Sequence, residues 1–221
     1  MKRILLTAFI LTAALLVFAG CNINATNSIR GTGSMTTQNI NATDFAGIDI
    51  GGSYVLNFRQ ADHFAVTLEI QENLFRYVDA TVRNGVLRIS SDRNFNTTSA
   101  NRPRLYVYAP YLDNLRVSGA VDADMTLDVE RLEIDIAGAA NVNLTGSADR
   151  LNIISSGASD LNAFDFIARD VFVNISGAGN ADVYATDALE ARISGAGIIR
   201  YDGNPQVTRN VSGVGSVRSR N

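Results

Sequence analysis

The sequence predicts an all-β fold, a right-handed parallel β-helix, from three observations. The tripeptide Ser-Gly-Ala or a close variant recurs along the second half of the chain, and its glycines are 18 to 20 residues apart. Apolar residues around each glycine recur with a period of two, which is typical of strands with one buried face. A repeat of this length cannot contain a strand, a helix and two turns, but it matches one coil of a solenoid.

The chain begins with a segment typical of a secretory signal. Lys2 and Arg3 precede an apolar run over residues 4–18, and Ala-Gly-Cys follows this run. This order is typical of signal peptides with a small-residue cleavage site. Cys21 is the only cysteine, and cleavage before it would leave it as the first residue. The sequence therefore predicts a lipoprotein signal peptide over residues 1–20 and lipidation of Cys21. An ordinary secreted protein with one unpaired thiol is the alternative.

The segment after the signal is rich in Asn, Thr, Ser and Gly, with few apolar residues. Such a composition does not bury enough surface to order itself, so residues 21–43 are expected to form a flexible tether. The remaining residues, 44–221, are expected to form one β-helix domain. A lipid anchor would place this domain in the bacterial cell envelope, on the outer membrane or on the outer face of the cytoplasmic membrane.

The first part of the predicted domain is less regular than the rest. Residues 64–70 alternate as a strand, and Asn84-Gly85 predicts a tight hairpin between two further strands. Residues 105–109 form another predicted strand, while residues 91–104 read as a long polar loop. The stretch around Gly52 aligns with a later repeat, so the solenoid is expected to begin near Phe45.

Each repeat carries a glycine that is expected to lie at a corner of its coil. A corner needs either a positive φ or close approach of two backbones, and glycine permits both. The small residue after each glycine is expected to fill a narrow corner interior. The predicted corner glycines are Gly52, Gly119, Gly138, Gly157, Gly177, Gly195 and Gly213.

Several stretches together resemble the bacterial GIN-domain family, whose members are labelled auto-transporter adhesin head domains. The stretches are FAGIDIGGSYVLNFRQ, ENLFRYVDATVRNGVLRIS, PRLYVYAPYLDNLRVSGA and the SGAG series, and the resemblance covers about residues 40–221. It implies a right-handed β-helix-like fold in envelope proteins. It supplies no established catalytic residues.

Two columns of Asp and Asn, three and five residues after successive glycines, form the candidate ligand face. Carboxylate and amide oxygens could hold a hard cation such as Ca²⁺ or bond to sugar hydroxyls. Asn and Asp ladders that stabilise the coils are the alternative. The columns consist of Asp122, Asp124, Asn141, Asn143, Asp160, Asn162, Asn180 and Asp182.

The composition narrows the possible functions. The net charge of −3 and the single histidine, His63, argue against nucleic-acid binding and against a histidine metal cluster. No catalytic residue and no cofactor is expected, with Ca²⁺ at the Asp and Asn columns as the alternative. The sequence favours a non-catalytic binding, adhesion or scaffolding module with a glycan or an envelope protein as partner. The alternative is a carbohydrate-active enzyme of the polysaccharide lyase or hydrolase type.

Aromatic residues in the first part of the domain are expected to pack in the core or in an end cap, with stacking on sugars as the alternative. These residues are Tyr54, Phe58, Tyr106, Tyr108 and Tyr111.

Overall fold

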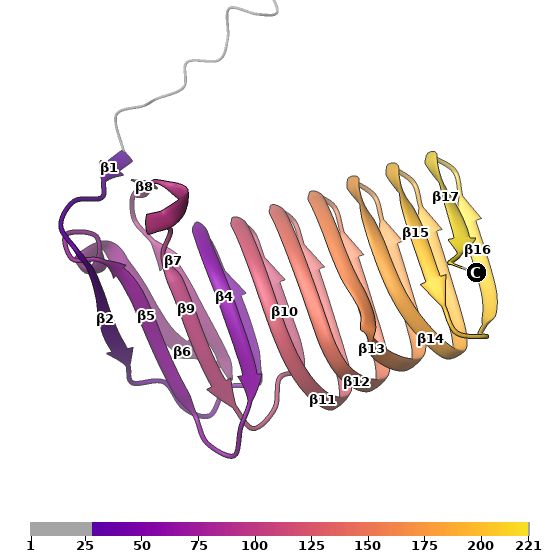
Figure 1. The fold of residues 1–221 in the computed structure, drawn as a ribbon, viewed down its shortest axis with the longest axis horizontal. Coiled ribbons are helices and arrows are strands. Elements are labelled where there is room, and N and C mark those ends of the chain that lie inside the picture. The colour runs from indigo at the N-terminus through magenta and orange to yellow at the C-terminus, as the bar shows by residue number, and fades with distance from the viewer. Residues whose placement is uncertain (1–27, 221) are drawn as a thin grey trace, which may run out of the picture.

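The computed structural model describes residues 28–220, so the predicted signal peptide and Cys21 lie outside the described residues. The described chain forms a rod of stacked, mostly parallel β coils, with a more irregular cap at the N-terminal end (Figure 1). The predicted parallel β-helix is therefore confirmed. Within residues 28–220, no helix is both long and apolar enough to cross a membrane.

The coils are long strands that wrap around the rod. Each runs along one face, bends, and returns along the other face. The wrapping strands are β11 (Ala120–Ile136), β12 (Ala139–Ser155), β13 (Ala158–Ile175) and β14 (Ala178–Ile193), and the last coils are completed by β15 (Ala196–Asp202), β16 (Gln206–Val211) and β17 (Val214–Ser219).

The rod therefore has two sheet faces. The first half of β11 pairs with β4 (Ser53–Gln60), and its second half pairs with β10 (Asn114–Val117). We call the layer that contains β4 and the first halves of the coils the front sheet. The opposite layer, the back sheet, continues from β10 through β3 (Gly47–Ile50) to β7 (Val86–Ser91) and β6 (Val78–Arg83).

The N-terminal cap completes the front sheet with strands from distant parts of the sequence. Strand β9 (Arg104–Ala109) pairs with β4 in parallel and with β5 (Ala65–Gln71) in antiparallel orientation. The predicted hairpin joins β6 and β7, and both of its turn residues, Asn84 and Gly85, adopt positive φ. A short 3-10 helix, Phe75–Tyr77, lies in the connection before β6.

The structure corrects the predicted tether. Strand β1 (Ser28–Arg30) pairs with β8 (Asn94–Asn96), and β2 (Met35–Ile40) pairs with β5 along its whole length. Ile29 and Ile40 pack against the core, so these few apolar residues suffice once β5 offers an open edge. The described fold thus begins at Ser28 rather than at residue 44. The predicted loop over residues 91–104 likewise contains β8 and a short 3-10 helix, Ser99–Asn101.

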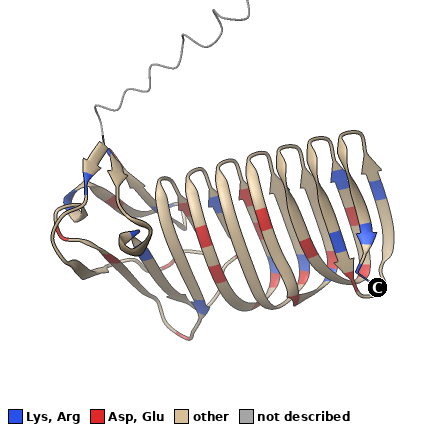
Figure 2. Ribbon diagram, turned by 45° about the horizontal axis from the view of Figure 1, so that its top comes forward, with Lys and Arg blue, Asp and Glu red and all other residues tan. Residues whose placement is uncertain are grey.

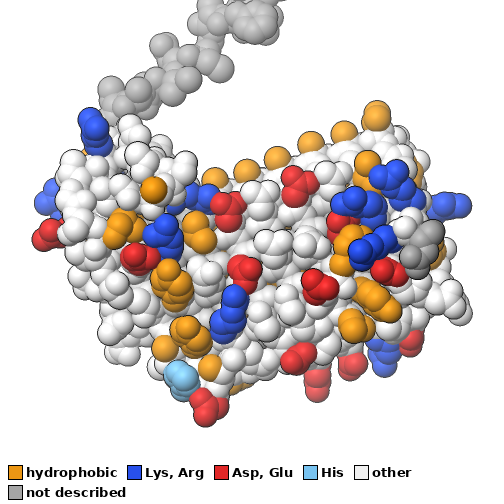
Figure 3. All heavy atoms as spheres, in the orientation of Figure 1, with side chains coloured by type: hydrophobic (Ala, Val, Ile, Leu, Met, Phe, Trp, Pro, Cys, Tyr) orange, Lys and Arg blue, Asp and Glu red, His pale blue; other side chains and the backbone are white. Residues whose placement is uncertain are grey.

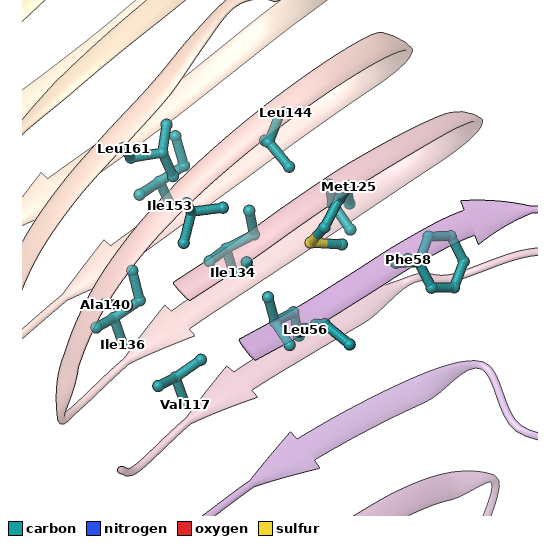
Figure 4. Packing of buried hydrophobic residues seen from close by; sticks show 14 of the residues in the cluster. Leu56, Phe58, Val117, Met125, Ile134, Ile136, Ala140, Leu144, Ile153 and Leu161 are labelled. Carbon is teal, nitrogen blue, oxygen red and sulfur yellow. The ribbon is translucent and has the colours of Figure 1, made fainter. Parts of the chain in front are cut away.

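The core is a set of apolar columns between the two sheets. Equivalent residues of successive coils stack on one another, as Ile134 and Ile153 do, or Phe58, Met125 and Leu144 (Figure 4). Ser155 is the polar member of one column, and its hydroxyl oxygen lies 2.7 Å from that of Ser159, so each buried hydroxyl has a partner.

Close backbone approach, not unusual φ, explains the glycines of the coils. Only Gly52 of the predicted corner glycines has a positive φ, of 105°. A β-carbon on Gly157 would lie 1.8 Å from the carbonyl oxygen of Gly138, and one on Gly138 would lie 2.0 Å from that of Gly119. The carbonyl of Gly138 also accepts the N–H of Ala158 at 2.9 Å. Each corner glycine from Gly119 onward therefore fits directly against the coil before it.

The residue after each corner glycine points outward, which contradicts the prediction that it fills the corner. Ala120, Ala139 and Ala158 are exposed, whereas the next residues, Val121 and Ala140, are buried. The alternation of inward and outward positions continues through the corner, from buried Val117 to buried Val121, so the alanine takes an outward position. The result is an apolar row, the alanine row, along the upper edge of the rod (Figure 3). It comprises Ala120, Ala139, Ala158, Ala178, Ala196 and Val214.

Replacement of Gly157 by Ala is expected to destabilise the fold by about 3 kcal/mol, because the added methyl group overlaps a backbone oxygen that cannot move away. Gly85→Ala is the matched control: nothing lies within 4 Å of its β-carbon, so only the positive φ costs free energy, about 1 kcal/mol. Urea unfolding of both variants measures the difference. Equal losses for the two would contradict the close-approach explanation.

Candidate functional site

The predicted Asp and Asn columns form two straight rows on the outward surface of the front sheet. Parallel pairing without a shift aligns β11, β12, β13 and β14 at these positions, so equivalent residues are immediate neighbours. The first row contains Asp122, Asn141, Asp160 and Asn180, and the second row contains Asp124, Asn143, Asn162 and Asp182.

The first row is a ladder of amides and carboxylates. Asn141 Nδ2 donates to Asp122 Oδ1 at 2.8 Å, and Asn180 Nδ2 donates to Asp160 Oδ1 at 2.8 Å. The Arg102 guanidinium closes the N-terminal end of the row with an ion pair to Asp122. It also donates to the carbonyl of Tyr54 at 2.7 Å. The amide of Asn141 lies between the two carboxylates of this row and so reduces the repulsion between them.

The second row has an arginine at each end. Arg59 pairs with Asp124 at 2.6 Å, and Arg200 donates through Nε to Asp182 Oδ1 at 2.6 Å. The Asp182 side chain is largely buried, whereas Asp124 is half exposed. The hydrogen bond and the charge of Asp182 raise the pKa of Arg200.

The middle of the second row is less strongly bonded. Asn162 Nδ2 lies 3.5 Å from Asn143 Oδ1, at the limit of a hydrogen bond, and both side chains are exposed. Next to them, Thr126 and Thr145 are neighbours in a third outward row and are also exposed. This region offers neutral amide and hydroxyl groups with capacity for further hydrogen bonds.

The charge balance of the rows suits a neutral ligand better than a cation. Asp122, Asp124 and Asp182 each pair with an arginine. No group of three His, Cys, Asp or Glu side chains within residues 28–220 is placed to hold a metal ion. Figure 2 shows acidic positions on the middle coils and basic positions concentrated near the last ones.

Two shallow depressions follow these rows. The larger, of about 470 Å³, lies between the first row and the alanine row and has Arg102 and Ser53 at its N-terminal end. The smaller, of about 190 Å³, lies between the two rows and ends at Arg200. The surface is thus grooved along the rod, across the strands.

Sequence reasoning missed the N-terminal extension of the rows. Asn57 continues the second row on β4, and Tyr106 continues it on β9. Strand β4 belongs to the stretch that aligns with a later repeat, and Asn57 lies five residues after Gly52, so the spacing of the second row could have found it. Strand β9 pairs with β4 across a long stretch of sequence and carries no repeat motif, so no periodic signal marks Tyr106. Of the predicted aromatic residues, Tyr54 and Phe58 are buried in the core, and Tyr108 and Tyr111 are exposed.

The two arginine pairs of the second row are expected to differ in strength. Because Asp182 is largely buried and Asp124 is half exposed, the Asp182–Arg200 coupling energy should exceed that of Asp124–Arg59. Double-mutant cycles with alanine, followed by thermal unfolding, measure both couplings. A coupling at Asp124–Arg59 as large as that at Asp182–Arg200 would contradict this prediction.

Solved structures share the fold at low sequence identity. A "putative adhesin" from Bacteroides fragilis is 19% identical, with a TM-score of 0.69, and covers 86% of this chain and 99% of its own. A "Putative lipid binding protein" from Parabacteroides distasonis is 24% identical, with a TM-score of 0.56, over 88% of this chain and 100% of its own. A "putative adhesin" from Parabacteroides merdae is 22% identical, with a TM-score of 0.54, over 88% and 100%.

No protein of curated function matches the sequence. The profile of one family, described as "Putative auto-transporter adhesin, head GIN domain", matches residues 44–205. This range includes β3 of the back sheet, β4 of the front sheet and the whole of β11 to β14. It also includes every residue of the two polar rows. The resemblance seen in the sequence is thereby confirmed, and the chain belongs to the GIN-domain family.

Proposed function

We propose that this protein is a non-catalytic adhesion module of the cell envelope that holds an extended glycan along the polar rows of the front sheet. The observation that carries the proposal is the register of the coils. It sets equivalent amides and carboxylates side by side over four successive strands. The family description and the descriptions of the structural neighbours name adhesion, which supports a binding role.

The chemistry of the surface supports a carbohydrate. Asn143, Asn162 and the neighbouring threonines present neutral donors and acceptors, which are the partners that sugar hydroxyls need. The alanine row borders the larger groove with methyl groups, against which the C–H face of a sugar ring can pack. The groove follows the rod axis, so a chain lying in it meets the same groups again at each coil.

The repeated coils can increase the affinity of this surface for a repeating glycan. Successive coils are about 4.8 Å apart, an interval comparable to the length of one unit in an extended polysaccharide. Each contact can be weak, because binding of one unit raises the effective concentration of the next. A rigid rod with an amide or a carboxylate at the same place on each coil suits this mode of attachment.

A carbohydrate-active enzyme on the same fold is the weaker candidate. Hydrolysis of a glycosidic bond needs two carboxyl groups free to act on opposite sides of the bond. In the rows, three of the four carboxylates are paired with arginine and Asp160 accepts a hydrogen bond from Asn180. Turnover of any glycan by the purified protein would favour the enzyme.

Glycan binding is testable by unfolding. A neutral oligosaccharide long enough to span several coils, at a hundredfold excess over its dissociation constant, should raise the free energy of unfolding by about 2.7 kcal/mol. The Asn143→Ala, Asn162→Ala double variant should lose this shift. The matched control replaces Asn152 and Asn174, which lie on the same strands but on the back sheet, and should keep it. Loss in both variants, or a shift in neither, would contradict binding along the front rows.

We further propose that Cys21 anchors the module to the membrane by a lipid, with the segment before β1 as the connection. The motif after the apolar run supports this assignment. Cys21→Ser should move the protein from the membrane fraction to the soluble fraction of a bacterial host and should prevent incorporation of labelled palmitate. Retention of the variant in the membrane fraction would contradict the lipid anchor.

A further inference from the structure

A patch of aromatic side chains lies on the N-terminal cap, beside the polar rows. Tyr108 and Tyr111 are the exposed tyrosines of the described chain, at 41% and 44%. The ring of His63 lies nearly parallel to that of Tyr108, with 6.3 Å between the ring centres and 11° between the planes. We call His63, Phe64, Tyr108 and Tyr111 the aromatic patch. Figure 3 shows the histidine and neighbouring apolar side chains at the lower left.

The patch is held rigidly by the core beneath it. Phe64 meets Tyr111 edge to face at 6.0 Å, and on its other side it packs against the buried Phe45 at 5.0 Å. Tyr108 is fixed by strand β9, where its neighbours Val107 and Ala109 are buried. Exposed aromatic rings supported in this way keep their faces available without a large entropic cost on binding.

The patch continues the front sheet rather than standing apart from it. Tyr108 on β9 is the register neighbour of Arg59 on β4, which is in turn the neighbour of Thr126 on β11. Thr145 on β12 is next in the same line. The tyrosine therefore ends an outward row that crosses the same coils as the Asp and Asn rows.

A groove of about 400 Å³ connects the patch to this row. It is lined by Arg59, Gln60, Asp62 and Asp128, among others. Gln60 forms a fixed wall, because its Nε2 donates to the carbonyl of Pro110 at 2.9 Å and its Oε1 accepts the N–H of Asp128 at 2.7 Å. The groove adjoins the aromatic patch directly, since Asp62 precedes His63 and Pro110 precedes Tyr111.

The charge around the groove favours an uncharged ligand. Asp62 and Asp128 line the groove together with one guanidinium, that of Arg59, which already pairs with Asp124. The hydrogen bond from His63 and its charge lower the pKa of Asp62, so this exposed carboxyl stays ionised at neutral pH. An anionic sugar would meet like charge here, whereas hydroxyl groups can donate to these carboxylates.

We propose that the aromatic patch is the stacking subsite of the glycan site, where one neutral sugar ring packs its C–H face on Tyr108 or Tyr111 while the chain continues along the rows. This inference rests on the proposed function and extends it. In this proposal, binding of the glycan begins at the cap end of the rod. The ligand is a neutral saccharide rather than a uronic or sulfated one. Arg59, Asp62 and Asp128 are the groups that bond to the hydroxyls of the stacked sugar.

The test titrates the purified protein with neutral glucose and N-acetylglucosamine oligomers of increasing length, and with oligogalacturonates as charged counterparts. Calorimetric titration measures the affinity of the parent and of every variant. Because the chain contains no tryptophan, a change in the tyrosine emission of the parent additionally reports a sugar ring that stacks on an exposed tyrosine. A Tyr108→Ala, Tyr111→Ala double variant should bind neutral oligomers of every length about tenfold more weakly. Tyr108→Phe should bind as the parent does. The Asn143→Ala, Asn162→Ala variant should weaken only the longer oligomers.

The outcomes separate the two proposals. Unchanged affinity in the tyrosine double variant, together with lost affinity in the asparagine variant, would overturn the stacking subsite and leave the glycan site in place. Tighter binding of oligogalacturonates than of neutral oligomers would overturn the assigned ligand class. No binding of any oligomer by the parent protein would overturn both proposals. Thermal unfolding without ligand confirms that each variant is folded.

Discussion

The contact between stacked corner glycines is the constraint on which the rest of the structure depends. At each corner, the backbone of one coil lies against the carbonyl of the coil before, with no room for a side chain between them. The same carbonyls accept hydrogen bonds from the next coil, for example from Ala139 to Gly119 at 2.8 Å and from Ala158 to Gly138 at 2.9 Å. Contact and hydrogen bond together allow one register only. A slip by one residue would place a side chain in the contact and turn the apolar columns outward.

Because the register is fixed, equivalent residues of successive coils are neighbours in space. The side chains at each such position must therefore be compatible with copies of themselves on the adjacent coils. Apolar columns gain burial from the repetition, but repeated charges would repel. The front sheet resolves this by alternating Asp with Asn in the first row, by placing Arg102 at one end of that row, and by placing Arg59 and Arg200 at the two ends of the second row. The back sheet alternates whole charges instead, from Arg88 through Asp49 and Arg116 to Asp135. Stability and a regular polar surface therefore have the same origin.

The cap has a different role. Its strands β9 and β5 cover the N-terminal edge of the front sheet. Strand β9 also carries Tyr106 and Tyr108, which lie at the N-terminal ends of the outward rows. Its loops supply Arg102, which closes the first row and joins it to the backbone of β4. The regular coils thus provide length, and the irregular cap provides chemically distinct groups at one end. This division is consistent with a rod that recognises an extended ligand at one end and holds it along its side.

The sequence by itself determined the coil length, the corner glycines, the membership of both polar rows and the hairpin at Asn84-Gly85. All of these depend on short-range spacing or on local turn preference, because equal spacing in a solenoid means adjacency in space. Only the tertiary structure decided that the alanines after the corner glycines face outward, because it shows that the alternation of the strand continues through the corner and that the glycine, not the alanine, lies against the preceding coil. It also decided that Met35–Ile40 is a strand, because β5 offers the edge that pairs with it. The same holds for the extension of the second row through Tyr106 and for the pairing of Arg59 and Arg102 with the rows. These contacts join residues 20 or more positions apart, and no repeat motif marks Tyr106, Arg59 or Arg102.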